Sequence, residues 1–312
     1  MQVGITGATG FIGKMLIDEC LKKKYSVRVL SRNSGKFYKE HRDKIDIYTA
    51  DLLDESSNIE SFCNGLDVLF HCAGEIRNTS LMYDLHVKAT QRLVDCAAGR
   101  VKRWVQLSSV GAYGSNHLGF VNENTEEIPV GEYEVTKTLS DNIIKKAAKE
   151  NLFEITIVRP SNVIGETMSN NSLFALIKMV KKGLFFYVGT KQVVSNYTHV
   201  RNVVGALLLC AIEPKSKNQT YIISEYCSLE ETMIAISEGL GCSVPKLVVP
   251  KYFVKMIAFF FCFIPKFPLT MSRVEALTNT TIYDGSYISK HIGFEYQSSL
   301  KGDLKNLGHM LR

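Results

Sequence analysis

The feature that most constrains the fold is a glycine-rich turn near the start of the chain, Gly7-x-x-Gly10-x-x-Gly13. An apolar run at 2–6 leads into it, and apolar residues at helical spacing follow over 11–21. A strand, a tight turn and a helix N-terminus in this order can bind a diphosphate, because the helix presents free N–H groups to the anion. Gly7 permits the turn, Gly10 lets the backbone approach the diphosphate, and Gly13 lets the helix pack against the strand. A glycine triplet alone often marks only a tight turn, but its context here predicts a dinucleotide-binding unit.

From residue 1 to about 160, apolar runs typical of strands alternate with helical patterns. We expect strands at 2–6, 26–31, 46–50, 67–71, 103–108 and 154–159. We expect helices near 11–24, 55–64, 79–99 and 131–150. Because the strands are apolar throughout, the alternation predicts a parallel sheet with helices on both faces. The expected class is α/β, a Rossmann-type doubly wound parallel sheet with its ligand crevice at the carboxyl ends of the strands.

The pattern becomes irregular after residue 165. The expected elements there are a helix near 172–182, a strand at 185–188, strands at 196–200 and 219–224 around a helix at 202–212, and a mostly helical remainder. We therefore expect residues 1–165 to form the dinucleotide-binding domain, with 195–225 returning to it. Residues 166–194 and 226–312 are expected to form a smaller α/β lobe that binds substrate and caps the crevice.

Composition and charge exclude several classes of protein. The 312 residues are 46% hydrophobic and 22% charged, as in ordinary globular proteins, and the net charge of +6 is mild. Lysine and arginine are dispersed, which argues against a nucleic-acid partner but suits a phosphorylated substrate. The eight cysteines and seven histidines show no metal-ligand spacing, so we predict no metal site and reduced thiols. The first strand begins at residue 2, which leaves no room for a signal peptide, and a cytoplasmic protein is expected.

One apolar run, residues 256–264, is similar to a membrane segment but is too short to span a bilayer. It ends at Pro265. Two interpretations remain, a buried or dimer-interface helix and a surface helix that leans on a membrane. We favour the first, and we expect a homodimer with no stable membrane insertion.

Tyr133 and Lys137 are the strongest candidates for catalysis. Residues four apart on a helix share one face, so both side chains can point into one crevice. The ordinary pKa of a tyrosine hydroxyl, about 10, is too high for acid–base work at neutral pH, and a neighbouring ammonium lowers it. The spacing alone usually marks a surface pair, but its position after the fifth expected strand favours a proton donor with the group that tunes it.

Two serines, Ser108 and Ser109, stand at the carboxyl end of that fifth strand, before Val110-Gly111-Ala112-Tyr113-Gly114. A hydroxyl at this place can hydrogen-bond a carbonyl that is being reduced. The alternative is a turn that uses Ser and Gly for their backbone freedom.

Taken together, the glycine turn, this strand end and the Tyr/Lys helix resemble the extended class of the short-chain dehydrogenase/reductase superfamily, the NAD-dependent epimerase/dehydratase family. The resemblance continues through 159–165 and reaches 283–286 and 292–294, nearly the whole chain. It implies that Ser109 is the catalytic serine, Tyr133 the general acid/base, and Lys137 the lysine that lowers the tyrosine pKa and holds the nicotinamide ribose. Substrate contacts are expected at Ser109, Val110, Asn162, His86 and Arg273. Cofactor contacts are expected at Gly7, Thr9, Gly10, Phe11, Ile12, Gly13, Ser31, Arg32, Asp51, Leu52, Ala73, Gly74, Tyr133, Lys137 and Pro160.

Three positions depart from the family pattern. His86 stands where the family usually has Asn, and it either replaces structural hydrogen bonds or contributes to a proton path; we favour the first. Asn202 replaces an Asp in the segment that follows Tyr197. Ser195 replaces an arginine that grips phosphate in several relatives, and Arg273 is the candidate substitute.

The residues after the second strand favour NADP(H). Relatives that prefer NAD end this strand with an acidic residue that accepts the ribose 2′-hydroxyl. This chain has Ser31 and Arg32 instead. An arginine can pair bidentately with a 2′-phosphate, which an acidic residue would repel. The alternative is an ordinary exposed arginine at a strand end, with NAD as the cofactor.

The resemblance leaves three functions open. The expected one is reduction of a nucleotide-linked 4-keto-6-deoxy sugar at C4 by NADPH, with Tyr133 as proton donor. The alternatives are a 4-epimerase of a nucleotide sugar or lipid-linked sugar with bound NAD, and a non-catalytic NADP-sensing protein. Segments such as 188–190 are similar to bacterial epimerases and reductases of surface-polysaccharide (O-antigen) pathways. The family resemblance also implies a dimer formed by the helices at 79–99 and 131–150.

Overall fold

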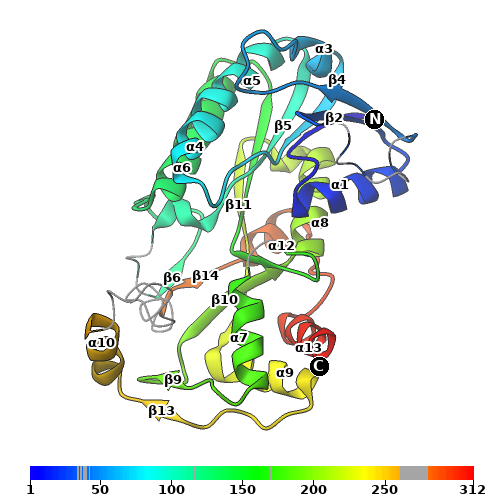
Figure 1. Ribbon diagram of the computed structural model, residues 1–312. Coiled ribbons are helices and arrows are strands. Elements are labelled where there is room, and N and C mark those ends of the chain that lie inside the picture. Colours follow the sequence, from blue (N-terminus) through cyan, green and yellow to red (C-terminus); the bar gives the residue numbers. More distant parts are fainter. Residues whose placement is uncertain are drawn as a thin grey trace.

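A seven-stranded parallel sheet forms the centre of the molecule in the computed structural model, with the strand order β11-β7-β5-β4-β1-β2-β3 (Figure 1). The structure describes residues 1–33, 35, 37, 41, 43–114, 117, 119–168, 171–260 and 280–312, with 257–260 by their backbone alone. The strands are β1 (Gln2–Thr6), β2 (Ser26–Ser31), β3 (Ile45–Thr49), β4 (Leu66–His71), β5 (Val101–Leu107), β7 (Glu154–Pro160) and β11 (Gln219–Ile223). The chain winds outward in both directions from β1, which lies between β2 and β4. This topology opens a crevice at the carboxyl ends of β1 and β4.

Helices cover both faces of the sheet (Figure 1), which explains why its strands are apolar throughout. On one face lie α1 (Phe11–Lys22) and α8 (Val200–Ile212), whose apolar sides pack on the alternate residues of β1 and β2. On the other face lie α3 (Glu60–Cys63), α5 (Ala89–Ala97) and α6 (Glu132–Lys149), packed around the fully buried Trp104. The sheet is therefore the middle layer of three.

Residues 162–168, 171–199 and 225 onward build the second part of the molecule. Its three-stranded sheet contains β8 (Asn162–Ile164), β10 (Val194–His199) and β12 (Glu225–Ser228). Three helices share a core with it: α7 (Ser172–Lys181), α9 (Leu229–Leu240) and α13 (Leu300–Met310). The remaining elements are the strand pairs β6 (Phe120–Val121) with β14 (Ile282–Tyr283) and β9 (Tyr187–Val188) with β13 (Val248–Val249), and the helices α4 (Thr79–Tyr83), α10 (Lys251–Phe260) and α12 (Ser286–Ile292).

The predicted α/β class and doubly wound sheet are confirmed, and the strand ends of the large sheet lie within two residues of the predicted ones. The expected helix at 79–99 is interrupted by a π-helical turn, Asp84–Lys88, and the helix expected near 55–64 is only Glu60–Cys63. Within the expected returning segment 195–225, α8 and β11 pack with the large sheet, whereas β10 lies in the small one. From the expected substrate lobe, α12 packs beside β11, where Ile288 joins the core of the large sheet.

No helix in the part of the chain that the structure describes is long and apolar enough to cross a membrane. Most of the apolar run 256–264, and with it Arg273, lies outside the residues whose side chains are described. The seven cysteines in the described ranges are free thiols.

Candidate active site

The glycine turn joins β1 to α1 with little room for any other residue at two of its positions. Gly7 has φ +68°, and a Cβ atom there would lie 2.4 Å from the carbonyl oxygen of Cys72. A Cβ atom on Gly13 would lie 2.3 Å from the carbonyl oxygen of Gly7. No side chain caps the N-terminus of α1, where Gly10 is the capping residue. The first N–H groups of α1 are therefore available to an anion, as a diphosphate site requires.

A cleft of about 210 Å³ opens in front of this turn, at the carboxyl ends of four adjacent strands. It brings together most of the predicted cofactor residues: Gly7, Thr9, Gly10, Ser31, Arg32, Asp51, Leu52, Ala73 and Gly74. The predicted residues Phe11 and Ile12 instead begin α1 and pack on the core. The cleft and its glycines fit the diphosphate and adenosine of a dinucleotide.

The wall of the cleft at the end of β2 carries a positive charge. Arg32 is exposed, and within the described residues no carboxylate pairs with it. Ser31 Oγ accepts a hydrogen bond from the backbone N–H of Asn33 at 3.2 Å. The acidic residue in the lining, Asp51, accepts a hydrogen bond from the backbone N–H of Leu53 at 3.0 Å. Arg32 is thus free to meet an anionic group in the cleft.

The loop that carries Asp51 and Leu52 is fixed by an arginine that the sequence did not single out. Arg92 on α5 donates hydrogen bonds to the carbonyl oxygens of Asp51 at 3.1 Å, Leu52 at 3.2 Å and Ser57 at 2.7 Å. One guanidinium therefore holds the floor of the cleft in place. Nothing in the local sequence around Arg92 signals this role, because its partners lie far away along the chain.

Helix α6 places Lys137 inside the protein, at the end of β5. Its Nζ atom donates a hydrogen bond to the carbonyl oxygen of Leu107 at 2.7 Å, and the side chain is buried. Burial lowers the pKa of Lys137, while Asp141 and Cys72 act in the opposite direction. The start of α6 is closed by Glu134, whose carboxylate accepts the backbone N–H groups of 130 and 131 at 3.0 and 3.2 Å.

Tyr133 lies one turn before Lys137, and its hydroxyl is close to Ser109. Burial raises the pKa of Tyr133 to about 12; a hydrogen bond with Ser109 lowers it and the charge of Asp141 raises it. The expected lowering by Lys137 is therefore wrong for the protein without ligands, because burial outweighs hydrogen bonding and Lys137 is held at Leu107. Tyr133 keeps its proton at neutral pH.

Ser109 begins the short 3-10 turn Val110–Tyr113, and its Oγ atom accepts the backbone N–H of Gly111 at 3.1 Å. The serine thus caps a turn and also reaches Tyr133, and its contact with a substrate carbonyl stays a prediction. Val110 packs in a small core with Tyr113 and Ile222.

His86 lies in the π-helical turn between α4 and α5, and both of its ring nitrogens have partners. The backbone N–H of Glu75 donates to Nε2 at 2.9 Å, so the proton sits on Nδ1, which faces the hydroxyl of Thr136 at 2.8 Å. The ring meets that of Tyr133 edge to face, with centroids 5.6 Å apart. Burial and the charge of Lys137 lower the pKa of His86 to about 4. These contacts favour the structural role over a proton path or a substrate contact.

A buried ionic network that sequence reasoning missed lies beneath the catalytic candidates. Asp141 Oδ2 accepts hydrogen bonds from Ser108 Oγ at 2.7 Å and from Arg159 Nη2 at 2.9 Å. Arg159 also pairs with Glu127 at 2.8 Å and stands 4.9 Å from the ring centre of Tyr113. The sequence signal that could have identified Asp141 is its spacing, because it follows Lys137 by four residues and so lies on the same helix face.

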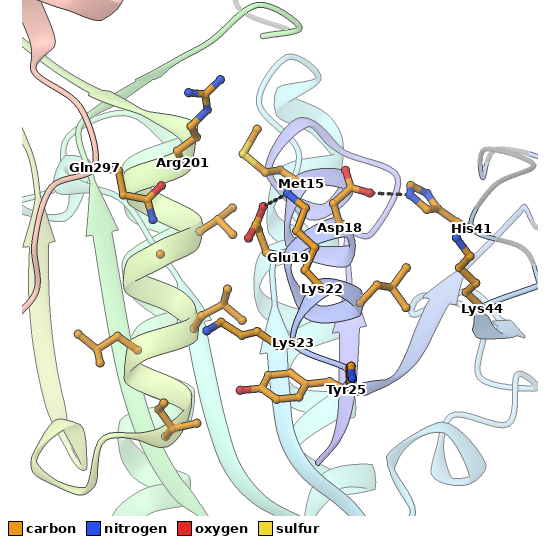
Figure 2. A pocket seen from close by; sticks show the side chains of 17 residues that line it. Met15, Asp18, Glu19, Lys22, Lys23, Tyr25, His41, Lys44, Arg201 and Gln297 are labelled. Atoms are coloured by element: carbon orange, nitrogen blue, oxygen red, sulfur yellow. Dashed lines mark hydrogen bonds and ion pairs between the residues drawn. The ribbon is translucent and has the colours of Figure 1, made fainter.

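A larger hollow of about 1170 Å³ lies between α1 and α8, on the outer face of the sheet (Figure 2). Lys22 pairs there with Glu19, and His41 with Asp18, each at 2.6 Å. None of the predicted catalytic, cofactor or substrate residues lines this hollow. The smaller cleft is therefore the candidate cofactor site, and its lining does not include the catalytic candidates Ser109, Tyr133 and Lys137.

Comparison with known proteins agrees with this geometry. Residues 3–224 match the NAD dependent epimerase/dehydratase family. The chain belongs to this family, among the extended short-chain dehydrogenases/reductases. It is 24% identical to a UDP-glucose 4-epimerase of Vibrio cholerae, covering 96% of this chain and 92% of that protein. It is 27% identical to a putative dihydroflavonol 4-reductase of Synechocystis, covering 98% of this chain and 93% of that protein.

Solved structures share the same fold. A UDP-glucuronic acid 4-epimerase from Bacillus cereus in complex with NAD matches with a TM-score of 0.77 at 19% identity, covering 99% of this chain and 96% of that one. A UDP-glucose 4-epimerase from Thermotoga maritima with UDP-glucose matches with a TM-score of 0.75 at 20% identity, covering 100% and 99%. As a member of the epimerase/dehydratase family, the chain has the fold and the cleft for a nicotinamide dinucleotide.

In this member of the epimerase/dehydratase family, the segment after β7 connects the large sheet, which carries the cofactor cleft, to the second lobe. Pro160 ends β7 and is buried, and the exposed Asn162 donates from Nδ2 to the carbonyl oxygen of Asn196 at 3.2 Å. Asn202, where the family usually has Asp, donates to Glu225 Oε2 at 3.3 Å and accepts the backbone N–H of Gln297 at 2.9 Å. The amide of Asn202 thus donates to a carboxylate and accepts from an N–H group. An aspartate could accept the N–H but could not donate to Glu225 when both are ionised.

Proposed function

We propose that the protein is an NADP(H)-dependent oxidoreductase that acts at C4 of a nucleotide sugar and reduces a nucleotide-linked 4-keto-6-deoxy sugar. The observation that carries the proposal is the position of Arg32 on the cleft wall, where no carboxylate of the described residues pairs with it. A guanidinium there favours a 2′-phosphate over a 2′-hydroxyl. NADPH is the usual reduced cofactor for net reduction, so this residue also favours a reductase.

The proposal assigns separate roles in carbonyl reduction to Ser109, Tyr133 and Lys137. When bound, the nicotinamide supplies a hydride to the carbonyl carbon. Ser109 hydrogen-bonds the carbonyl oxygen, and Tyr133 donates the proton that completes the alcohol. The raised pKa of Tyr133 supports this direction of reaction, because the hydroxyl holds its proton until an alkoxide develops beside it. In this proposal Lys137 positions the nicotinamide ribose.

A nucleotide sugar is the proposed substrate because the relatives suggest it. The chain is similar over nearly its full length to a UDP-glucose 4-epimerase, and a solved structure of the same fold contains UDP-glucose. In this proposal Ser109, Val110, Asn162 and Arg273 contact the substrate. The same similarity supports the second candidate, a 4-epimerase that keeps NAD bound and returns the hydride to the opposite face.

We further propose that the protein works in the cytoplasm as a homodimer in the supply of sugars for surface polysaccharide. The proposed dimer contact is formed by α4, α5 and α6. It is supported by three large apolar side chains of α4 and α6 that are exposed, Leu81, Tyr83 and Leu139.

The experiment that tests the function is a panel of nucleotide 4-keto-6-deoxy sugars with NADPH, followed by the loss of absorbance of the reduced nicotinamide. Tyr133→Phe is the control for background oxidation. A parallel assay of UDP-glucose and UDP-N-acetylglucosamine without added cofactor reports epimerisation. Turnover of a 4-keto sugar supports the reductase, and epimerisation without added cofactor assigns the second candidate instead.

A further inference from the structure

The outer end of the second lobe carries a group of exposed apolar side chains. Helix α10 is attached there by Val254, which is fully buried against Val188 of β9. The opposite side of α10 carries Tyr252, Phe253 and Met256, which are 76%, 53% and 40% exposed. A helix of this kind has one face on the protein and one apolar face in solvent.

Exposed apolar side chains also lie in segments near α10. Leu184 and Leu247 are each 62% exposed and Val248 is 41% exposed. These segments lie together because β9 pairs with β13, and the backbone N–H of Tyr187 donates to the carbonyl oxygen of Leu247 at 2.9 Å (Figure 1). We call the six exposed residues the apolar tip: Leu184, Leu247, Val248, Tyr252, Phe253 and Met256.

The two chain segments that carry the apolar tip have lysines but no carboxylates of their own, and one of these lysines, Lys191, pairs with Glu230. The segments 167–191 and 239–260 contain no Asp or Glu. Their lysines include five for which the described part of the chain provides no carboxylate partner: Lys178, Lys182, Lys246, Lys251 and Lys255. Exposed tyrosine, phenylalanine and methionine in segments that carry lysine and no acidic residue are typical of a helix in the headgroup region of an anionic membrane.

We propose that the apolar tip and its lysines bind the surface of a bilayer that contains anionic phospholipids, with α10 lying in the interface. Tyrosine suits this position because its ring is apolar and its hydroxyl stays hydrated. A second copy of the chain is disfavoured as the occupant. A two-fold interface brings the same patch of each subunit together, so the lysines of one copy would face those of the other. This peripheral site goes beyond the proposed reaction, which does not need it for a soluble nucleotide sugar.

The test is cosedimentation of the full chain with vesicles of phosphatidylcholine alone and of phosphatidylcholine mixed equally with phosphatidylglycerol. We expect a partition constant at least about tenfold higher on the mixed vesicles, since each lysine near an anionic surface contributes on the order of fivefold. Raising the salt concentration should reduce this difference, because the headgroup charges become screened.

Paired variants locate the binding surface. The double variant Tyr252→Ala with Phe253→Ala should weaken binding to mixed vesicles by about tenfold, whereas Ile212→Ala with Met310→Ala, exposed apolar residues on other helices, should not. The double variant Lys182→Glu with Lys246→Glu should abolish the preference for vesicles that contain phosphatidylglycerol. The control double variant Lys23→Glu with Lys149→Glu should retain this preference. Circular dichroism and an unchanged melting temperature confirm that each variant is folded.

Three results would overturn the proposal. One is equal binding of the wild type to both kinds of vesicle, or to neither. Another is unchanged vesicle binding of both the Tyr252→Ala/Phe253→Ala and the Lys182→Glu/Lys246→Glu variants. The third is loss of a dimer in the Tyr252→Ala/Phe253→Ala variant without vesicles, seen by light scattering, which would assign the surface to a second copy.

Discussion

The Nζ atom of Lys137 donates a hydrogen bond to the carbonyl oxygen of Leu107, 2.7 Å away. This contact ties α6 to the end of β5, directly before the two serines at 108 and 109. A buried ammonium needs such a partner, because an unsatisfied charge in the interior is costly. The position of Lys137, and with it the face of α6 that carries Tyr133, is therefore set by the fold itself.

The catalytic assignment predicts a clear division between two variants. Tyr133→Phe should reduce turnover by about 10²–10⁴-fold while cofactor affinity stays nearly unchanged, because only the proton donor is lost. Lys137→Ala should reduce both turnover and cofactor affinity. Steady-state kinetics with fluorescence titration of the cofactor measure the two effects. Near-normal turnover by Tyr133→Phe would show that another group donates the proton.

The buried ionic network predicts a large loss of stability when it is broken. In Arg159→Met, Asp141 keeps the hydrogen bond from Ser108 but remains buried without its counter-charge, so unfolding free energy should fall by about 3–5 kcal/mol. The matched control is Lys305→Met, which removes an exposed pair with Glu238 and should cost less than about 1 kcal/mol. Urea denaturation of the two variants measures the difference. Equal effects would mean that the network adds nothing to stability.

The glycine turn predicts that two similar substitutions differ in effect. Gly7 and Gly99 both have positive φ, +68° and +71°, so alanine has a similar backbone cost at each. Only at Gly7 would the new Cβ atom meet backbone, 2.4 Å from the oxygen of Cys72. Gly7→Ala should therefore lower the melting temperature further than Gly99→Ala and should alone weaken cofactor binding. Calorimetry and cofactor titration check both points, and equal behaviour would contradict the assigned role of the turn.

Buried histidines predict a loss of stability in acid. Burial lowers the pKa of His86 from 6.5 to about 4, and that of His71 from 6.5 to about 3. The unfolded chain takes up these protons below pH 6.5 while the folded chain does not, so stability is present above this pH and is lost as the pH falls toward the folded pKa values. Each histidine should contribute about 1.4 kcal/mol per pH unit in this window.

His86→Asn tests this directly, since asparagine cannot take up the proton. Between neutral pH and about pH 5, the unfolding free energy of the variant should decrease less steeply than that of the wild type. The difference in slope should correspond to close to one proton fewer taken up on unfolding. His309→Asn, a change at an exposed histidine, is the control and should leave the slope unchanged. If His86→Asn also leaves the slope unchanged, the histidine does not lose its proton affinity on folding.

The sequence predicted the parts of the fold that depend on local pattern. The six apolar runs, the glycine turn and the Tyr133/Lys137 face follow from residue periodicity and from the conformational needs of glycine, and the structure contains each of them. The cleft then follows from topology, because parallel strands end at one edge.

The remaining features depend on partners that are distant along the chain. Arg92 fixes a loop some forty residues earlier, and Asp141 meets Arg159 only because α6 packs on β7. The ring of His86 in the π-helical turn is held by hydrogen bonds with Glu75 and Thr136, which belong to two other segments. The direction of the Tyr133 pKa shift was wrong because burial, which the sequence does not reveal, dominates it.

The most direct test of the central claim is the affinity of the wild type for NADPH and for NADH, measured by titration of the protein after any bound nucleotide has been removed. A charge-assisted contact between Arg32 and the 2′-phosphate is worth about 1.5–3 kcal/mol, so NADPH should bind about ten- to a hundredfold more tightly. Arg32→Asp should abolish or reverse this preference, whereas Lys23→Asp, away from the cleft, should keep it. Equal or tighter binding of NADH by the wild type, or copurification of tightly held NAD, would contradict the reductase account and make the epimerase the better assignment.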